Sequence, residues 1–215
     1  MGRHTAASRL RTSTRVRAVL AGALTLGVGS TMTLASWTDT VFATGSFTAS
    51  RFDTQSSIDN SAWADNTAAP GASITFNGAG MSPDTHRYGY VLVRGKANSV
   101  AGTLTFAAPT VANGGTDTTP FLGAALQYRA VAITAAGCTS ATFTTGTPVF
   151  IVGTASTYSA LTTAGPTGVA LPAATASPSA PAGYCFDVYL PAGADSALQG
   201  KSANATWQIT ATSVP

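Results

Sequence analysis

The sequence predicts an all-β protein: a single antiparallel β-sandwich that follows a cleaved N-terminal signal peptide. Three features of the composition favour strands over helices. Thr contributes 35 of the 215 residues, whereas the chain contains no Glu and two Lys, so the residues that usually cover helix surfaces are scarce. The 22 Gly and 11 Pro supply the frequent turns that short strands need. One domain of this kind fits the length of the chain.

The first 35 residues have the layout of an export signal. Five Arg and no acidic residue lie in the first 17 positions, and the uncharged apolar run Ala18–Gly29 follows. Small residues close the segment, so we expect cleavage near Ala35 or Ser36. An uncleaved anchor is the alternative, because the uncharged stretch is just long enough to cross a bilayer, but Gly, Ser and Thr dilute it. The predicted domains are a signal peptide at 1–35 and a sandwich at 36–215.

Alternation of apolar and polar residues predicts the strands of the sandwich. From Tyr184 to Leu190 the even-numbered residues are apolar and should face the core, whereas Cys185, Asp187 and Tyr189 should face the other side of a half-buried strand. Further strands are expected at Ser46–Phe52, Ala72–Phe76, Tyr88–Arg94, Gly102–Phe106, Leu126–Thr134, Ala141–Thr144, Pro148–Val152 and Ala205–Thr212.

Two stretches interrupt this pattern. Residues 55–71 are polar and rich in Ala, and could hold one short helical turn. Residues 162–183 contain four Pro, which lack the amide donor that a central strand needs, so we expect a long surface loop there. The residues after this loop are too few to form a core alone and should return as strands into the same sandwich.

The distribution of charge argues against a nucleic-acid partner. The whole chain carries a net charge of +3, but beyond Arg17 there are six Arg and Lys against eight Asp, a net charge of −2. The six cations are neither clustered nor interleaved with aromatic residues, as a nucleic-acid surface would require. Contact with a membrane is expected only through the leader, before cleavage.

The two cysteines, Cys138 and Cys185, are expected to form a disulfide. A lone pair of cysteines in an exported chain usually does so, and closing this loop of about 48 residues stabilises a fold by about 4 kcal/mol on the chain-entropy estimate. A reactive or metal-binding thiol pair is the weaker alternative, because the chain has no C-x-x-C spacing.

The catalytic inventory is sparse, so we expect no enzyme, no cofactor and no metal site. His86 is the single His beyond the leader; a turn at Ser82-Pro83-Asp84 should leave it exposed. Without Glu, no H-E-x-x-H zinc-peptidase helix exists. The carboxylates of Asp53, Asp59 and Asp65 could supply part of a calcium site, but Asx turns are the better interpretation.

The boundary around the expected cleavage site resembles that of a known family. It reads LASWTDTVFATGSFTASRFD from Leu34 to Asp53, with Trp37 and Asp39 ahead of Phe42-Ala43-Thr44-Gly45. This is similar to the boundary in exported Gram-positive proteins of the TasA/camelysin family, which depend on a SipW-type signal peptidase. The segments GYCFDVYLP at Gly183–Pro191 and SALQGKSANATWQITATS at Ser196–Ser213 resemble the actinobacterial-type members.

The resemblance implies a jelly-roll β-sandwich and a role in fibres of the extracellular matrix, built when each subunit lends its N-terminal strand to the next. The function expected is therefore that of a non-enzymatic structural protein, secreted to the cell surface or matrix. Its partners would be a SipW-type signal peptidase and further copies of itself. The residues of the expected assembly strand are Trp37, Asp39, Val41, Phe42 and Phe47.

The sequence also allows a second function, that of a monomeric cell-surface module that binds a glycan or a protein. Such a module needs exposed aromatic platforms on its strands or loops. The candidates are Trp63, Tyr158, Tyr184 and Tyr189, although alternation places Tyr184 on the core face.

Overall fold

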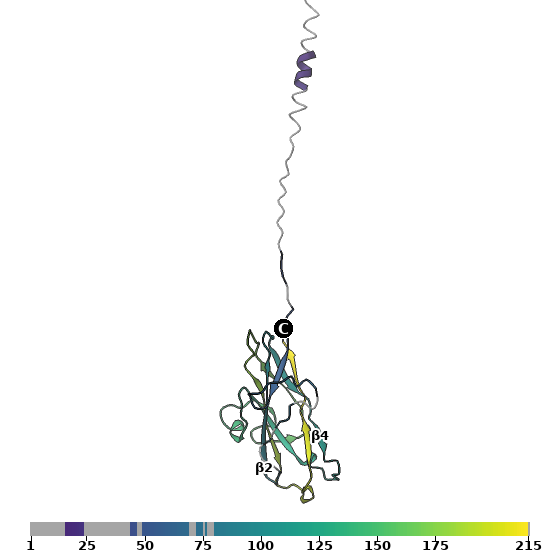
Figure 1. Cartoon of the computed structure of the whole chain (residues 1–215), viewed down its shortest axis with the longest axis vertical. Coiled ribbons are helices and arrows are strands. Elements are labelled where there is room, and N and C mark those ends of the chain that lie inside the picture. The colour runs from purple at the N-terminus through teal and green to yellow at the C-terminus, as the bar shows by residue number, and fades with distance from the viewer. Residues whose placement is uncertain are drawn as a thin grey trace, which may run out of the picture. The chain divides into compact units, whose positions relative to one another are not determined.

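The computed structural model describes residues 16–23, 44–46, 49–68, 72–74, 76 and 80–214. The chain divides into two compact units, Met1–Phe47 and Thr48–Pro215. In the first unit, residues 16–23 form an α-helix with Val19 and Leu20 exposed, at the start of the predicted apolar run (Figure 1). No helix within the described ranges is both long enough and apolar enough to cross a membrane.

The first layer of the second unit is a six-stranded sheet in which each strand pairs antiparallel with its neighbours. Strand β9 lies at its centre, with β2 on one side and β5 on the other. The order is β1 (Thr54–Ser57), β2 (Thr85–Gly95), β9 (Ala182–Leu190), β5 (Gln127–Ile133) and β6 (Phe150–Val152), and the short β7 (Ser159–Ala160) also pairs with β5.

The second layer consists of two small antiparallel sheets that continue one another. Strands β11 (Ile209–Ser213), β3 (Gly102–Phe106) and β8 (Gly165–Leu171) form one sheet, and β10 (Ala203–Thr206) and β4 (Thr110–Asn113) form the other. In the chain, β3 leads into β4 and β10 leads into β11. At the junction the amide of Ala107 donates to the carbonyl of Gln208 over 3.1 Å. One backbone hydrogen bond therefore joins the two chain segments where they pass from one small sheet to the other.

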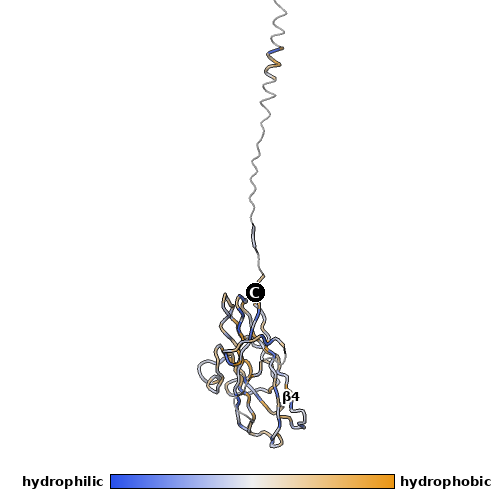
Figure 2. The backbone as a smooth tube through the Cα atoms, in the orientation of Figure 1, coloured by the Kyte–Doolittle hydropathy of each residue, from blue (hydrophilic) through white to orange (hydrophobic). Residues whose placement is uncertain are grey.

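The main core lies between these layers and confirms the predicted antiparallel β-sandwich. The largest side chains from the central strand, Tyr184 and Phe186, are fully buried, and the Phe106 ring from β3 packs edge-on against Tyr184 at 4.9 Å. Strand β3 shows the expected period of two, with buried and half-buried residues alternating. In Figure 2, apolar and polar residues are accordingly interspersed along the whole strand-rich unit.

The outer face of the first layer carries a second, smaller core, which the sequence did not predict. Leu92, Val131 and Cys185 on this face are buried beneath Phe143, which belongs to a 3-10 helix at Ser140–Phe143. Strand β9 is therefore buried on both faces, and the prediction of a half-buried strand there was wrong. The reason is that the segment after β5 folds back over the sheet instead of leaving it open to solvent.

The Pro-rich stretch 162–183 is also not one long loop. It contains β8 and the start of β9, so the loop is limited to residues 172–181. Among the described strands, β8 pairs with β3 alone, which makes it an edge strand. Pro166 is tolerated there because an edge strand does not need every amide as a donor.

Five smaller expectations also need correction. Residues 141–144 lie mostly in the 3-10 helix, where Thr139 and Thr142 form a capping box. The expected strand 205–212 is broken at Trp207 and Gln208, where the chain passes from β10 to β11. Among the described residues of 46–52, pairing is limited to an isolated bridge at Arg51, and the first strand is β1. Residues 55–68 hold β1 and turns in place of a helical turn, and 72–74 and 76 lie in no strand.

Candidate functional site

The residues that the sequence assigned to processing and assembly lie outside the described residues: Ala35, Ser36, Trp37, Asp39, Val41, Phe42 and Phe47. Phe52, further along the same segment, is described. Its half-buried ring packs against the main core and lies so close to Gly102 that a Cβ there would meet it at 2.7 Å. Phe52 therefore packs within its own chain.

The predicted disulfide is confirmed. Cys138 and Cys185 are bonded, with their Cα atoms 5.4 Å apart. Cys185 lies in the middle of β9, so the bond ties the segment that covers the outer face to the central strand of the first sheet. A disulfide is typical of chains that reside in an oxidising, extracellular compartment.

The most concentrated chemistry of the described chain surrounds Asp187, on the outer face of β9. The side chain of Asp187 is fully buried and accepts three hydrogen bonds of 2.9 Å: from Arg129 Nε, from the Tyr158 hydroxyl and from His86 Nδ1. Arg129 is itself buried, and its guanidinium also donates to the carbonyl of Ala155 over 2.5 Å. The carboxylate thus links β2, β5, β9 and the loop that precedes β7.

Strand register explains how these groups meet. Asp187 lies opposite Arg129 on β5 and Tyr88 on β2, and Tyr189 lies opposite His86. Directly opposed residues point to the same face of a sheet, so the pairing places them all on the outer face. His86 is therefore not the exposed turn residue that the sequence predicted, because the carboxylate of Asp187 binds it and leaves its side chain 32% exposed.

Four half-buried rings gather above the carboxylate; we call His86, Tyr88, Tyr158 and Tyr189 the ring cluster. The imidazole of His86 stacks on Tyr189 with centroids 4.5 Å apart and lies parallel to Tyr88 at 6.2 Å. Tyr158 leans against both His86 and Tyr189, at 5.5 and 4.9 Å. The hydroxyl of Tyr189 donates to Asp84 Oδ1 over 3.3 Å, which connects the cluster to an exposed carboxylate.

The surroundings shift the acidity of two of these phenols. Burial is the largest cause of the pKa shift at Tyr158, and the nearby charge of Asp187 is the second largest. Together they raise the pKa of Tyr158 far above its ordinary value. The same two causes raise the pKa of Tyr88. Both phenols therefore stay neutral at physiological pH and can serve as hydrogen-bond donors.

The acidic residues considered for calcium do not converge. The Asp59 carboxylate accepts from the amides of Ser61 and Ala62 in an Asx turn, and these bonds hold its pKa well below the usual range. Asp53 and Asp65 both approach Lys96 Nζ, at 3.3 and 2.6 Å. In the described ranges, no three His, Cys, Asp or Glu side chains are grouped as metal ligands.

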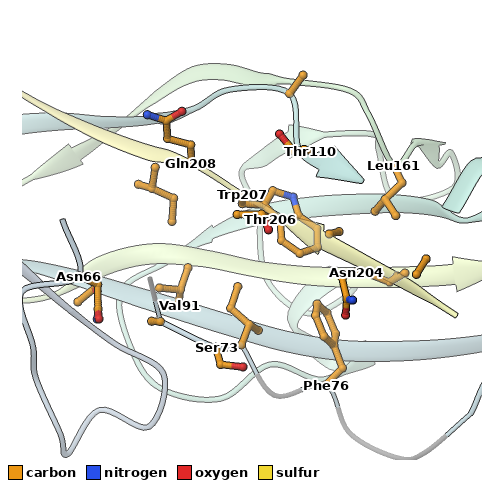
Figure 3. Close-up of a pocket in the computed structure, with 18 of the residues that line it drawn as sticks. Asn66, Ser73, Phe76, Val91, Thr110, Leu161, Asn204, Thr206, Trp207 and Gln208 are labelled. Atoms are coloured by element: carbon orange, nitrogen blue, oxygen red, sulfur yellow. The ribbon is translucent and has the colours of Figure 1, made fainter. Parts of the chain in front are cut away.

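A second feature is a groove of about 1280 Å³ along the side of the sandwich, which we call the edge groove. One wall comes from β1 and β2, including Val91, and the other from β10 and β11, including Ile209. Figure 3 shows Trp207 and Phe76 pointing into the same space, and their ring centroids are 6.0 Å apart. The edge groove therefore has an apolar interior between two strand edges.

The wall made by β10 and β11 has unused backbone groups. Among the described strands, β10 pairs with β4 alone and β11 with β3 alone, so each has one free edge. A free edge is a template for another extended chain. In comparisons with known proteins, no family model matches the chain, and no curated protein shows significant similarity to it.

Proposed function

We propose that this protein is a non-enzymatic structural component of the cell surface or extracellular matrix, exported through its leader and assembled by exchange of its N-terminal strand. The processing partner would be a SipW-type signal peptidase, which frees the segment that begins near Ser36. The observation that supports assembly most strongly is the edge groove with its free strand edge at β10 and β11.

Strand addition suits this groove on physical grounds. An extended segment placed along β10 and β11 would bond to their free amides and carbonyls, and its alternate side chains would enter the apolar interior. The donor in this proposal is residues 36–50 of a neighbouring copy, which carry Trp37, Val41 and Phe47. The donor ends before Arg51, because Arg51 already bridges Ser99 and Phe52 already packs on the core of its own chain.

The first test compares the oligomeric state of two chains, residues 36–215 and residues 51–215, by size-exclusion chromatography with light scattering. The longer chain is expected to form oligomers whose size grows with concentration, and the shorter chain to stay monomeric. A longer chain that remains monomeric at millimolar concentration contradicts the proposal.

Two matched variants then test the acceptor wall. Ala211 on β11 is half-buried and lines the edge groove, whereas its neighbour Thr212 is exposed and does not line it. Ala211→Arg places a charge where the donor's apolar side chains would sit, so it should abolish oligomers. Thr212→Arg adds the same charge on the opposite face of the strand and should leave them intact. Equal effects of the two variants would exclude this groove as the acceptor.

The ring cluster favours the second candidate function, a surface module that binds a ligand. Two of the platforms named from sequence, Tyr158 and Tyr189, lie together in it, whereas Tyr184 is buried in the main core. The two functions are compatible, because the ring cluster lies on the outer face of the first layer and the edge groove opens toward the core between the layers.

A further inference from the structure

We infer that the ring cluster and Asp84 form a binding site for a neutral glycan. The site is independent of the proposed assembly through the edge groove. It consists of partly exposed aromatic rings on β2, β9 and the loop that precedes β7, with two hydrogen-bond acceptors, Nε2 of His86 and the carboxylate of Asp84.

Hydrogen bonds to two carboxylates preorganise three of the four rings. The carboxylate of Asp187 fixes His86 through Nδ1 and Tyr158 through its hydroxyl, and Asp84 fixes Tyr189. Because Asp187 is fully buried and paired with Arg129, its bonds to His86 and Tyr158 are rigid anchors. A ligand that stacks on the rings therefore does not have to order them first, which removes a usual cost of binding.

The bond to Asp187 also fixes which tautomer the neutral ring of His86 adopts. A carboxylate accepts but does not donate, so Nδ1 carries the proton and Nε2 of the neutral ring is an acceptor. Within the described part of the chain, Nε2 takes part in no hydrogen bond. The exposed Asp84 carboxylate offers further acceptor capacity beside Tyr189.

This combination matches the chemistry of a sugar. A pyranose ring presents a face of C–H groups, which aromatic π-faces attract, and a rim of hydroxyls that can donate to Nε2 and to Asp84. An apolar protein partner would fit less well, because it would bury the Asp84 carboxylate without a donor.

The charge around the site selects a neutral ligand over an anionic one. The charges of Asp187 and Arg129 offset each other, and Asp84 remains as a negative group at the rim. Arg87, the nearest other cation on β2, is directed to the carbonyl of Gly80 at 2.7 Å and lines the edge groove on the other side of the sheet. An acidic saccharide would therefore meet repulsion and find no free cation among the described groups here.

The test is calorimetric titration of the exported protein with cellohexaose, maltohexaose and chitohexaose, with hexagalacturonate as the anionic comparator. At least one neutral hexasaccharide should bind saturably, and hexagalacturonate should bind at least about tenfold more weakly. Tyr189→Ala removes a stacking face and should weaken the neutral ligand about tenfold. Tyr189→Phe keeps the ring and should stay within about threefold of the unmodified protein.

Two further variants separate binding from folding. Asp84→Asn changes an exposed carboxylate, so it should preserve the fold, weaken the neutral ligand and reduce the discrimination against hexagalacturonate. Trp63→Ala is the matched control: Trp63 is a half-buried aromatic residue beneath the guanidinium of Arg94, which lies eight positions beyond His86 on β2. Trp63→Ala should leave affinity unchanged. Failure of all three neutral hexasaccharides to bind, preference for hexagalacturonate, or an equal loss with Trp63→Ala would each overturn the inference without touching the assembly proposal.

Discussion

At the scale of single residues, Asp187 determines more of the structure than any other charged group described. A buried carboxylate is costly unless its charge and its lone pairs are satisfied, and here Arg129 supplies the opposite charge while His86 and Tyr158 complete the hydrogen bonds. The guanidinium of Arg129 is held in turn between the rings of Phe143 and Tyr158, with centroids at 4.6 and 4.7 Å. The ring cluster and the outer core therefore share one electrostatic anchor.

Replacing this carboxylate should destabilise the protein strongly. Asp187→Asn keeps the side-chain volume but leaves Arg129 buried without a counter-charge, which we expect to lower the free energy of unfolding by about 3–5 kcal/mol. Urea denaturation followed by circular dichroism measures the loss. Asp84→Asn, which changes an exposed carboxylate with one long hydrogen bond, should stay within about 0.5 kcal/mol of the unmodified protein. A loss below about 1 kcal/mol for Asp187→Asn would contradict a central role for the ion pair.

At the scale of elements, β8 shows how packing rather than propensity places a strand. Gly165 begins β8 directly over the Phe106 ring, and a Cβ at this position would overlap the ring atoms Cζ, Cε1 and Cε2. The ring has little room to move, because Tyr184 and Phe186 pack against it at 4.9 and 5.8 Å. The absence of a side chain at Gly165 is what allows this edge strand to close over the core.

Replacement of Gly165 by Ala should therefore lower the stability of the protein. Reduced freedom of the unfolded chain would stabilise Gly165→Ala by about 0.4–1 kcal/mol, but overpacking of the core costs about 1–3 kcal/mol, so the variant should be less stable. Gly115→Ala is the control, because a Cβ there meets no atom within 4 Å. Thermal melts of both variants decide the matter. If the melting temperature of Gly165→Ala equals or exceeds that of the unmodified protein, the Phe106 ring can move aside for the added methyl group.

The same elements show what the sequence could and could not reveal. Strand β3 has the predicted bounds, and β2, β5 and β9 extend or trim the predicted segments by a few residues, because alternation is a local signal. Strand β8 was missed because Pro166 within it and Pro172 directly after it read as a loop, and only pairing with β3 alone makes Pro166 acceptable. The network beneath the ring cluster was missed for another reason: His86, Arg129 and Asp187 meet through register between strands, which local patterns do not carry.

At the scale of the whole molecule, the disulfide, the 3-10 helix and the Asp187 network give the two faces of the first sheet different surroundings. The disulfide and the 3-10 helix close the outer face over the middle of β9, and the Asp187 network closes it further along the same strand. Between the layers, aromatic packing fills the core, but the edge groove leaves one side open between β2 and β10–β11. Surfaces for a glycan and for another copy of the chain, as proposed above, can therefore operate on the same molecule.

Processing should reverse the charge of the molecule, because the cations are distributed so unevenly along the chain. The full chain has a net charge of +3 and a sequence pI of about 9.1, whereas removal of the five Arg before Ala18 leaves six cations and eight Asp, a net charge of −2. The protein recovered from the culture medium should thus focus below pH 7 and migrate toward the anode at neutral pH, opposite to the full-length chain. Isoelectric focusing of both forms, with intact-mass measurement of the exported one, makes the comparison. Recovery of a basic exported protein would mean that the Arg-rich leader is retained and that the assembly segment is never released.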